Sequence, residues 1–253
     1  MALNLDLMKQ KMASLTGKGD SKKNNFWRPQ EGENNIRIVP TADGDPFKEK
    51  FFHYGVGEQS FLCPKRNFGD ACPVCDFANQ LWNENTEESK QLAKGMFAKQ
   101  RFFSPVLVRG EESEGVKVWG YGKLAYQKLL GIVLDPDYGD ITDPEDGNDL
   151  KLMYGKQPGA SYPTTDIRPR PRKSVLCDDA VGGDERCAEL LETVPNFETI
   201  FERKTTEEVR AILDGHMSGE TTTDREIVRG GSNSSPVKQQ QDAVSAAFDE
   251  LLQ

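Results

Sequence analysis

The sequence predicts a mixed fold with a β core, in which several short strands form a small barrel and helices interrupt them. Residues 26–174 contain seven short, strand-like segments separated by frequent Gly and Pro. Three helical patterns interrupt these segments, and a fourth follows them. Hydrophobic residues make up 36% of the 253-residue chain and charged residues 29%, so we expect part of it to remain outside any core.

The predicted strands are short runs rich in β-branched and aromatic residues. They are NNIRIVP, FKEKFFHY, QSFLC, RFFSPVLV, GVKVWGY, DLKLMYG and RKSVLC. Helices are predicted over 76–83, 86–99 and 123–134. A further helix is predicted over 206–214, because Thr205 and Glu208 form a capping-box pattern and Gly215 can end the helix.

The two ends of the chain are polar, and we expect them to be disordered. Residues 1–25 combine apolar residues at helical spacing with the basic stretch GKGDSKKNN, which predicts a short helix and a flexible arm. Residues 219–253 begin as a Gly- and Ser-containing linker and end in the acidic segment DAVSAAFDELLQ. The predicted core is therefore 26–218.

The net charge of -9 is unevenly distributed. Residues 175–253 hold 17 of the 41 acidic residues but only 7 of the 32 basic residues. Residues 1–174 are nearly neutral, so the negative net charge of the whole chain does not exclude an anionic partner.

No apolar run is long enough to span a membrane. Asp6 and Lys9 interrupt the N-terminal segment where a secretion signal would be continuously apolar, so we expect an intracellular protein that is not secreted.

Four potential metal ligands follow the pattern His-x9-Cys-x8-Cys-x2-Cys: His53, Cys63, Cys72 and Cys75. Three thiolates and one imidazole suit a closed tetrahedral zinc site better than calcium or magnesium. Since all four positions are filled by protein, we expect one structural Zn²⁺ ion.

Three other interpretations of these cysteines fit the sequence less well. Unliganded core cysteines explain poorly why three of them lie in a turn-rich window, and a redox Cys-x2-Cys pair lacks a surrounding βαβ pattern. A zinc deaminase would need a Glu and a Pro where the chain has Gly55 and Ala71. Cys177 and Cys187 are predicted to be free thiols, with a second metal half-site as the alternative.

Aromatic and basic residues alternate in several predicted strands, which can place rings flanked by cations on one face. Such a face can hold single-stranded nucleic acid through base stacking and phosphate attraction. The glycines on either side of the second aromatic in WGYG favour outward-facing rings at Trp119 and Tyr121. The candidate DNA-binding residues are Arg101, Phe102, Trp119, Tyr121, Lys123, Tyr162, Arg168, Arg170 and Arg172.

The segments FFHYG, FLC, ACPVC, VKVWGYGKLAYQKLL and DITDPEDGNDLKLMYGKQ resemble the single-stranded DNA-binding proteins of T-even-type bacteriophages and their marine relatives, the gene 32 protein type. The resemblance covers about residues 8–175. It implies an OB-fold, a five-stranded Greek-key barrel, with an inserted zinc subdomain at about 51–100 and a helical flank.

The resemblance also implies a function. The protein would coat and protect single-stranded DNA cooperatively during phage replication, recombination and repair, in the cytoplasm of an infected bacterium. Residues 1–25 would serve self-association along the DNA lattice. The acidic tail would recruit phage replication and recombination proteins through Phe248, Asp249, Glu250, Leu251 and Leu252.

Two other classes of function compete with DNA binding. The aromatic face could instead dock a protein, which would make the chain a zinc-stabilised interaction module of a replication complex. An enzyme is not expected, because the sequence shows no catalytic carboxylate cluster, phosphate-binding Gly-rich loop or nucleophile motif.

Overall fold

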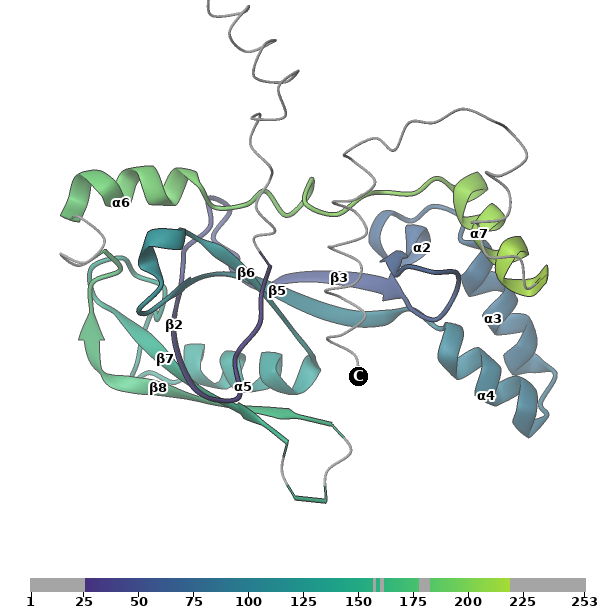
Figure 1. Ribbon diagram of the computed structural model, residues 1–253, viewed down its shortest axis with the longest axis horizontal. Helices are drawn as coiled ribbons and strands as arrows, with labels where there is room; N and C mark the ends of the chain where they lie inside the picture. The colour runs from purple at the N-terminus through teal and green to yellow at the C-terminus, as the bar shows by residue number, and fades with distance from the viewer. Residues whose placement is uncertain (1–25, 157, 160–161, 178–182, 219–253) are drawn as a thin grey trace, which may run out of the picture.

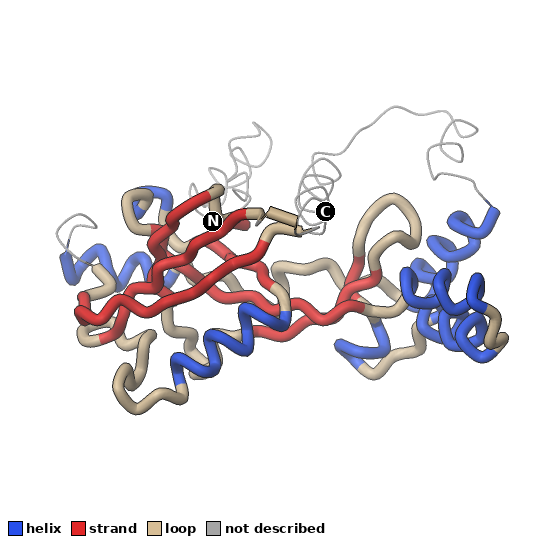
Figure 2. Tube along the Cα trace, turned by 90° about the horizontal axis from the view of Figure 1, so that it is seen from below, coloured by secondary structure: helices blue, strands red, loops and turns tan. Residues whose placement is uncertain are grey.

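The computed structural model describes residues 26–156, 158–159, 162–177 and 183–218. These residues form a β-rich lobe and a helical lobe, joined by a ribbon of two strands, β3 (Lys48–His53) and β5 (Lys99–Val108) (Figure 1). Figure 2 shows the same ribbon from below, running out of the sheet toward the helices. The expected arm 1–25 and the tail 219–253 lie outside the described residues.

The elements alternate irregularly along the chain. The strands are β1 (Phe26–Trp27), β2 (Gly32–Ile38), β3 (Lys48–His53), β4 (Phe61–Leu62), β5 (Lys99–Val108), β6 (Lys117–Tyr121), β7 (Gly147–Gly155) and β8 (Thr164–Ser174). The helices are α2 (Pro64–Phe68), α3 (Pro73–Asn83), α4 (Glu87–Met96), α5 (Lys123–Val133), α6 (Gly183–Glu192) and α7 (Thr206–Ser218), with a 3-10 turn at Glu112–Glu114.

The sheet follows the order β1-β6-β5-β2-β7-β8, with β3 paired to β5 and β4 paired to β3. Its neighbours are antiparallel except β1 and β6, which are parallel. A mixed fold of strands and helices is thus confirmed. The five-stranded Greek-key barrel stays a prediction, since no ladder joins β8 to β1 in the described part of the chain.

Strand β5 runs through both lobes and changes its pairing partner along its length. Residues 99–103 pair with β3, and residues 106–108 pair with β2. Pro105 lies between these two stretches, opposite Val39, and has no N–H to donate to the neighbouring chain there. Its carbonyl still accepts a hydrogen bond from the Val39 N–H at 2.9 Å.

Strands β5 and β6 are buried on both faces. One face carries Phe102, Trp119 and Tyr121 into the main core, where the Phe102 ring stacks on Tyr126 of α5 at 3.8 Å. The opposite face carries Phe103 into a second cluster against Phe201. The prediction that Trp119 and Tyr121 face outward is therefore wrong, because the chain covers both sides of these strands.

Most of the predicted helices match the observed ones. The capping box of α7 is confirmed, since the Glu208 carboxylate accepts from the Thr205 N–H at 2.7 Å and the Thr205 hydroxyl accepts from the Glu208 N–H at 3.3 Å. Gly215 does not end this helix, which continues to Ser218. Helices α2 and α6 were not predicted. None of the described helices has the length and apolar character that a bilayer crossing needs.

Cys177 and Cys187 form a disulfide, with their Cα atoms 5.5 Å apart. The prediction of free thiols is therefore wrong. The end of β8 and helix α6 pack together through Leu176 and Leu190, and this contact brings the two cysteines within bridging distance. Sequence spacing alone contains no information on that contact.

Candidate metal centre and nucleic-acid interface

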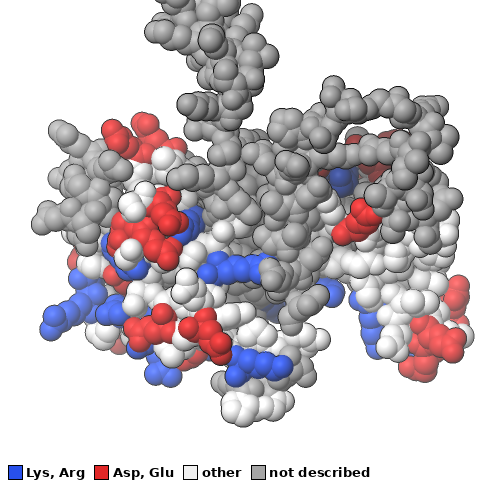
Figure 3. Space-filling view, viewed as in Figure 1, with Lys and Arg blue, Asp and Glu red and all other residues white. Residues whose placement is uncertain are grey.

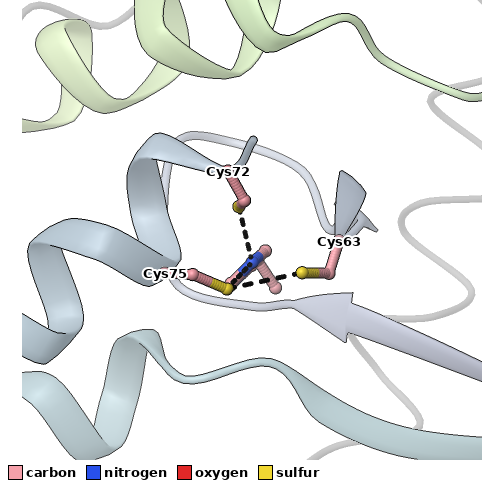
Figure 4. A group of neighbouring side chains, drawn as sticks. Cys63, Cys72 and Cys75 are labelled. Carbon is pink, nitrogen blue, oxygen red and sulfur yellow. Dashed lines mark hydrogen bonds between the residues drawn. The ribbon is translucent and has the colours of Figure 1, made fainter. Parts of the chain in front are cut away.

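The four predicted metal ligands converge at the base of the helical lobe (Figure 4). His53 is the last residue of β3, Cys63 follows β4, and Cys72 and Cys75 lie at the start of α3. All four are buried, and their ligand atoms lie within 4.8 Å of one another. The sequence prediction that these residues share one site agrees with the structure.

Two Cys-Pro dipeptides place cysteines at the starts of helices. Cys63 and Cys72 are each extended, as residues before proline are, and each is followed by a proline at the first turn of a helix. Both sulfur atoms therefore lie at helix N-termini, where the helix dipole favours negative charge. The Arg66 N–H donates to the Cys63 sulfur at 3.4 Å.

The geometry fits one tetrahedral ion. Zinc bonds of about 2.3 Å to sulfur and about 2.0 Å to nitrogen place neighbouring ligand atoms roughly 3.5 to 3.8 Å apart. The Cys63 and Cys75 sulfurs are 3.4 Å apart, and His53 Nε2 lies 3.3 Å from Cys72 and 3.5 Å from Cys75. His53 Nδ1 is 2.8 Å from the Met96 carbonyl, which orients Nε2 toward the sulfurs.

The close packing of these groups changes their pKa values. Hydrogen bonding from Cys63 and Cys75 lowers the pKa of the Cys72 thiol and so favours its thiolate. Burial lowers the pKa of His53, but hydrogen bonds to Cys63 and Cys72 raise it more, to about 9. At neutral pH, the binding of a metal ion therefore releases protons from the imidazole as well as from the thiols.

Asn67 of α2 connects the helical lobe to the edge of β3 through hydrogen bonds. Its side-chain amide donates to the Phe51 carbonyl at 2.7 Å and to the Cys63 carbonyl at 2.9 Å, and its oxygen accepts from the Phe51 N–H at 2.9 Å. Asn67 thus replaces a strand partner at this edge and holds Cys63 in place.

Asn67→Ala is expected to lower the free energy of unfolding by about 2 kcal/mol, because it leaves the Phe51 N–H without its acceptor and removes the two hydrogen bonds that the amide donates. Urea titration followed by circular dichroism measures this loss. Asn67→Asp is the matched control, since its carboxylate keeps the acceptor for Phe51, and its loss should be smaller. An equal loss in both variants would contradict this role for the amide.

Three of the four predicted DNA-binding aromatics lie together, and these three are buried. Trp119 and Tyr121 have ring centroids 4.4 Å apart, and Tyr121 shares a hydrogen bond of 2.7 Å with Ser104. Phe102 lies beside them in the same core cluster. Tyr162, in contrast, is 63% exposed and lies apart from that cluster, before β8.

The predicted cations differ in how they are neutralised. Arg168 pairs with Asp166 at 2.9 Å, and Arg170 lies 2.7 Å from Asn35 and 3.5 Å from Glu33. Arg101, Lys123 and Arg172 form no ion pair with another described residue. Figure 3 shows Lys and Arg side chains around the β-rich lobe intermixed with acidic ones, and others in the middle of the molecule between the lobes.

Two residues that sequence reasoning missed accompany Arg101. Lys99 and Arg101 both lie over the ring of Tyr54, at 5.8 and 5.9 Å from its centroid. The only available signal was the alternation of Lys99 and Arg101 in one strand, which does not reveal that Tyr54 lies beneath them.

A sequence model of the family described as gp32 DNA binding protein like matches residues 30–214. The chain belongs to this gp32-like family. The match includes all four metal-ligating candidates and runs from before β2 into α7. A comparison with curated proteins finds no match. The gp32-like region ends before the acidic tail, whose predicted partner-binding residues Phe248, Asp249, Glu250, Leu251 and Leu252 lie outside the described residues.

Proposed function

We propose that this protein binds single-stranded DNA without sequence preference. Membership in the gp32-like DNA-binding family is the observation that carries this proposal. Cations without carboxylate partners in the described structure, Lys99 and Arg101 on the β3–β5 ribbon and Lys123 beside it, support it further. Cations of this kind attract backbone phosphates, and this attraction does not depend on base identity.

The aromatic residues contribute in two ways under this proposal. Tyr162 exposes enough of its ring to stack on a base without rearrangement. The other three predicted aromatics are Phe102, Trp119 and Tyr121. Their rings are held in the core, so under this proposal they support the strands that carry the cations and do not stack on bases. Arg168 and Arg170 would first exchange a carboxylate for a phosphate, which weakens their net contribution.

The metal ion is proposed to be Zn²⁺ with a structural role. Three sulfur ligands and one nitrogen ligand suit zinc, and a site closed by four protein ligands leaves no position for a reacting water. When bound, the ion would cross-link β3, the segment after β4, and α3. The chain's own residues hold it, and no catalytic step is proposed.

The wider biology is proposed from the family resemblance. The protein would coat single-stranded DNA cooperatively in phage replication, recombination and repair, within the infected bacterium. Residues 1–25 would contact the neighbouring copy, and the acidic tail would bind other replication and recombination proteins. The arm and the tail both lie outside the described residues.

Binding to oligo-dT is expected to weaken steeply as salt rises, because phosphate contacts release counterions. Three to four contacts predict a slope of about -2 to -3 in log affinity against log salt, from roughly -0.7 per contact. Fluorescence anisotropy with a labelled oligo-dT measures this slope, and a duplex of equal length serves as the control. No binding at low salt would instead favour the zinc-stabilised protein-interaction module.

A further inference from the structure

One face of the β3–β5 ribbon gathers four cations. Strand alternation places Lys48 and Lys50 of β3 on the same face, and Lys99 and Arg101 of β5 on the same face. The register sets Lys50 directly opposite Arg101, so all four share one side of the ribbon. Like charges that face each other across a ladder destabilise it unless another group compensates.

Two of the four cations are neutralised within the protein. Lys48 pairs with Asp43, and Lys50 pairs with Glu198 at 2.9 Å. Lys99 and Arg101 form no ion pair with another described residue. Their charges therefore remain available to an anion from solution, unlike those of Arg168 and Lys128, which share Asp166.

The ring of Tyr54 lies beneath both available cations. The Lys99 ammonium is 5.8 Å and the Arg101 guanidinium 5.9 Å from the ring centroid, which is within the range of cation–π attraction. Tyr54 follows the metal-ligating His53 and packs against Phe52, with ring centroids 6.0 Å apart. The ring is only 6% exposed, so it is fixed in place while the cations lie over it.

The Arg101 guanidinium packs closely against the backbone of Gly122, which has no side chain to exclude it. A Cβ atom added at Gly122 would lie 3.2 Å from Arg101 Nη1, tighter than ordinary van der Waals contact. The guanidinium group thus occupies a defined position between Tyr54 and the start of α5.

We propose that Lys99 and Arg101 form a subsite for backbone phosphates of single-stranded DNA, and that Tyr54 is the positioning residue that holds them there. This inference rests on the proposed function. The planar guanidinium binds a phosphate through two parallel hydrogen bonds, and the ammonium adds a point charge. Holding both side chains in advance reduces the conformational entropy that they lose on binding.

The test compares Tyr54→Leu, which removes the ring, with Tyr54→Phe, which keeps it. Labelled oligo-dT is titrated by anisotropy over a range of salt concentrations. Tyr54→Leu is expected to weaken binding roughly three- to tenfold and to reduce the salt slope, as expected for two lost cation–π contacts. Tyr54→Phe should stay within about twofold of the unmodified protein, since the ring face is preserved.

The decisive measurement repeats Tyr54→Leu in a chain that also carries Lys99→Gln and Arg101→Gln. These two substitutions alone should reduce the salt slope by about 1.4, from roughly 0.7 per phosphate contact. If Tyr54 contributes to binding only by positioning Lys99 and Arg101, Tyr54→Leu does not weaken oligo-dT binding further in the chain that lacks both cations. An equal effect in both backgrounds would overturn the inference, because the ring would then act by stacking or by folding.

Gly122→Ala provides a second variant should Tyr54→Leu fail to fold. The added methyl group would lie 3.2 Å from Arg101 Nη1, so the guanidinium group must shift by a few tenths of an ångström while Tyr54 stays intact. It is expected to weaken oligo-dT binding, and this effect should vanish in the Lys99→Gln, Arg101→Gln background. Persistence of the effect, or no weakening at all, would overturn the subsite. Failure of the unmodified protein to bind oligo-dT refutes the proposed function itself, which is a distinguishable result.

Discussion

Cys72→Ser is expected to abolish stable metal binding and to unfold the helical lobe. The three cysteine ligands belong to the core cluster of that lobe, packed with Val74 of α3 and Val209 of α7. Structural zinc contributes about 10–16 kcal/mol of apparent binding free energy in zinc-finger peptides, comparable with the ~5–15 kcal/mol stability of a whole domain. Because this small lobe has few other cross-links, it should not survive the loss of a ligand.

Circular dichroism and metal analysis of the purified protein test this expectation. Cys72→Ser should lose helical signal and bound metal together, and a zinc-selective chelator should do the same to the unmodified protein. A calcium-selective chelator is the control and should have no effect. A variant that keeps its helical signal without metal would show that the lobe folds independently of an ion.

The metal site should also be sensitive to acid. His53 has a pKa raised to about 9 by its neighbouring thiols, and the ring must lose its proton before Nε2 can bind a metal. Competition by protons therefore grows as the pH falls below this value. Zinc affinity should consequently fall as pH falls, with protons released on binding at pH 7.

Arg37→Met is expected to lower the free energy of unfolding by about 3–5 kcal/mol. The Arg37 side chain is fully buried. Its guanidinium donates to the Asp143 carbonyl at 2.6 Å and to the Ser174 carbonyl and hydroxyl at 2.9 and 3.1 Å. It thus ties β2 to the loop before β7 and to the end of β8. Methionine fills a similar volume but makes none of these hydrogen bonds, and it also removes the ion pair of Arg37 with Asp149 at 3.5 Å.

Urea unfolding at neutral pH measures the effect. Arg37→Lys keeps the charge but lacks the planar fork of donors, so it should recover only part of the loss. Arg210→Met is the matched control, because Arg210 is exposed on α7 and its replacement should change stability by no more than about 0.5 kcal/mol. A loss below about 1 kcal/mol for Arg37→Met would contradict this role.

The metal site could be predicted because its information is local. The prediction rests on the order and spacing of His53, Cys63, Cys72 and Cys75, which lie within one short segment of the chain. The helices over α3, α4, α5 and α7 were predicted for the same reason, since periodicity and capping act within a few residues. The family match to residues 30–214 agrees with the resemblance that these motifs indicated.

The placement of the aromatic rings could not be predicted in this way. Alternation shows that Trp119 and Tyr121 share a face, but it does not show which face another segment covers. Phe201 lies about 80 residues further along the chain and covers the opposite face through Phe103. Both faces are consequently buried, and glycines beside the rings were not a reliable sign of exposure.

The sequence by itself determined the types of most elements, the grouping of the four candidate metal ligands and the family, because each depends on residues close together in the chain or on their order. Only the tertiary structure decided which rings are buried, that Cys177 joins Cys187, and which cations have no acidic partner among the described residues. These properties depend on contacts between distant segments: Lys50 finds its partner Glu198 148 positions away, whereas Lys99 and Arg101 find the ring of Tyr54. Burial and ion pairing act over a few ångströms in space, and local sequence patterns do not specify which distant residues come that close.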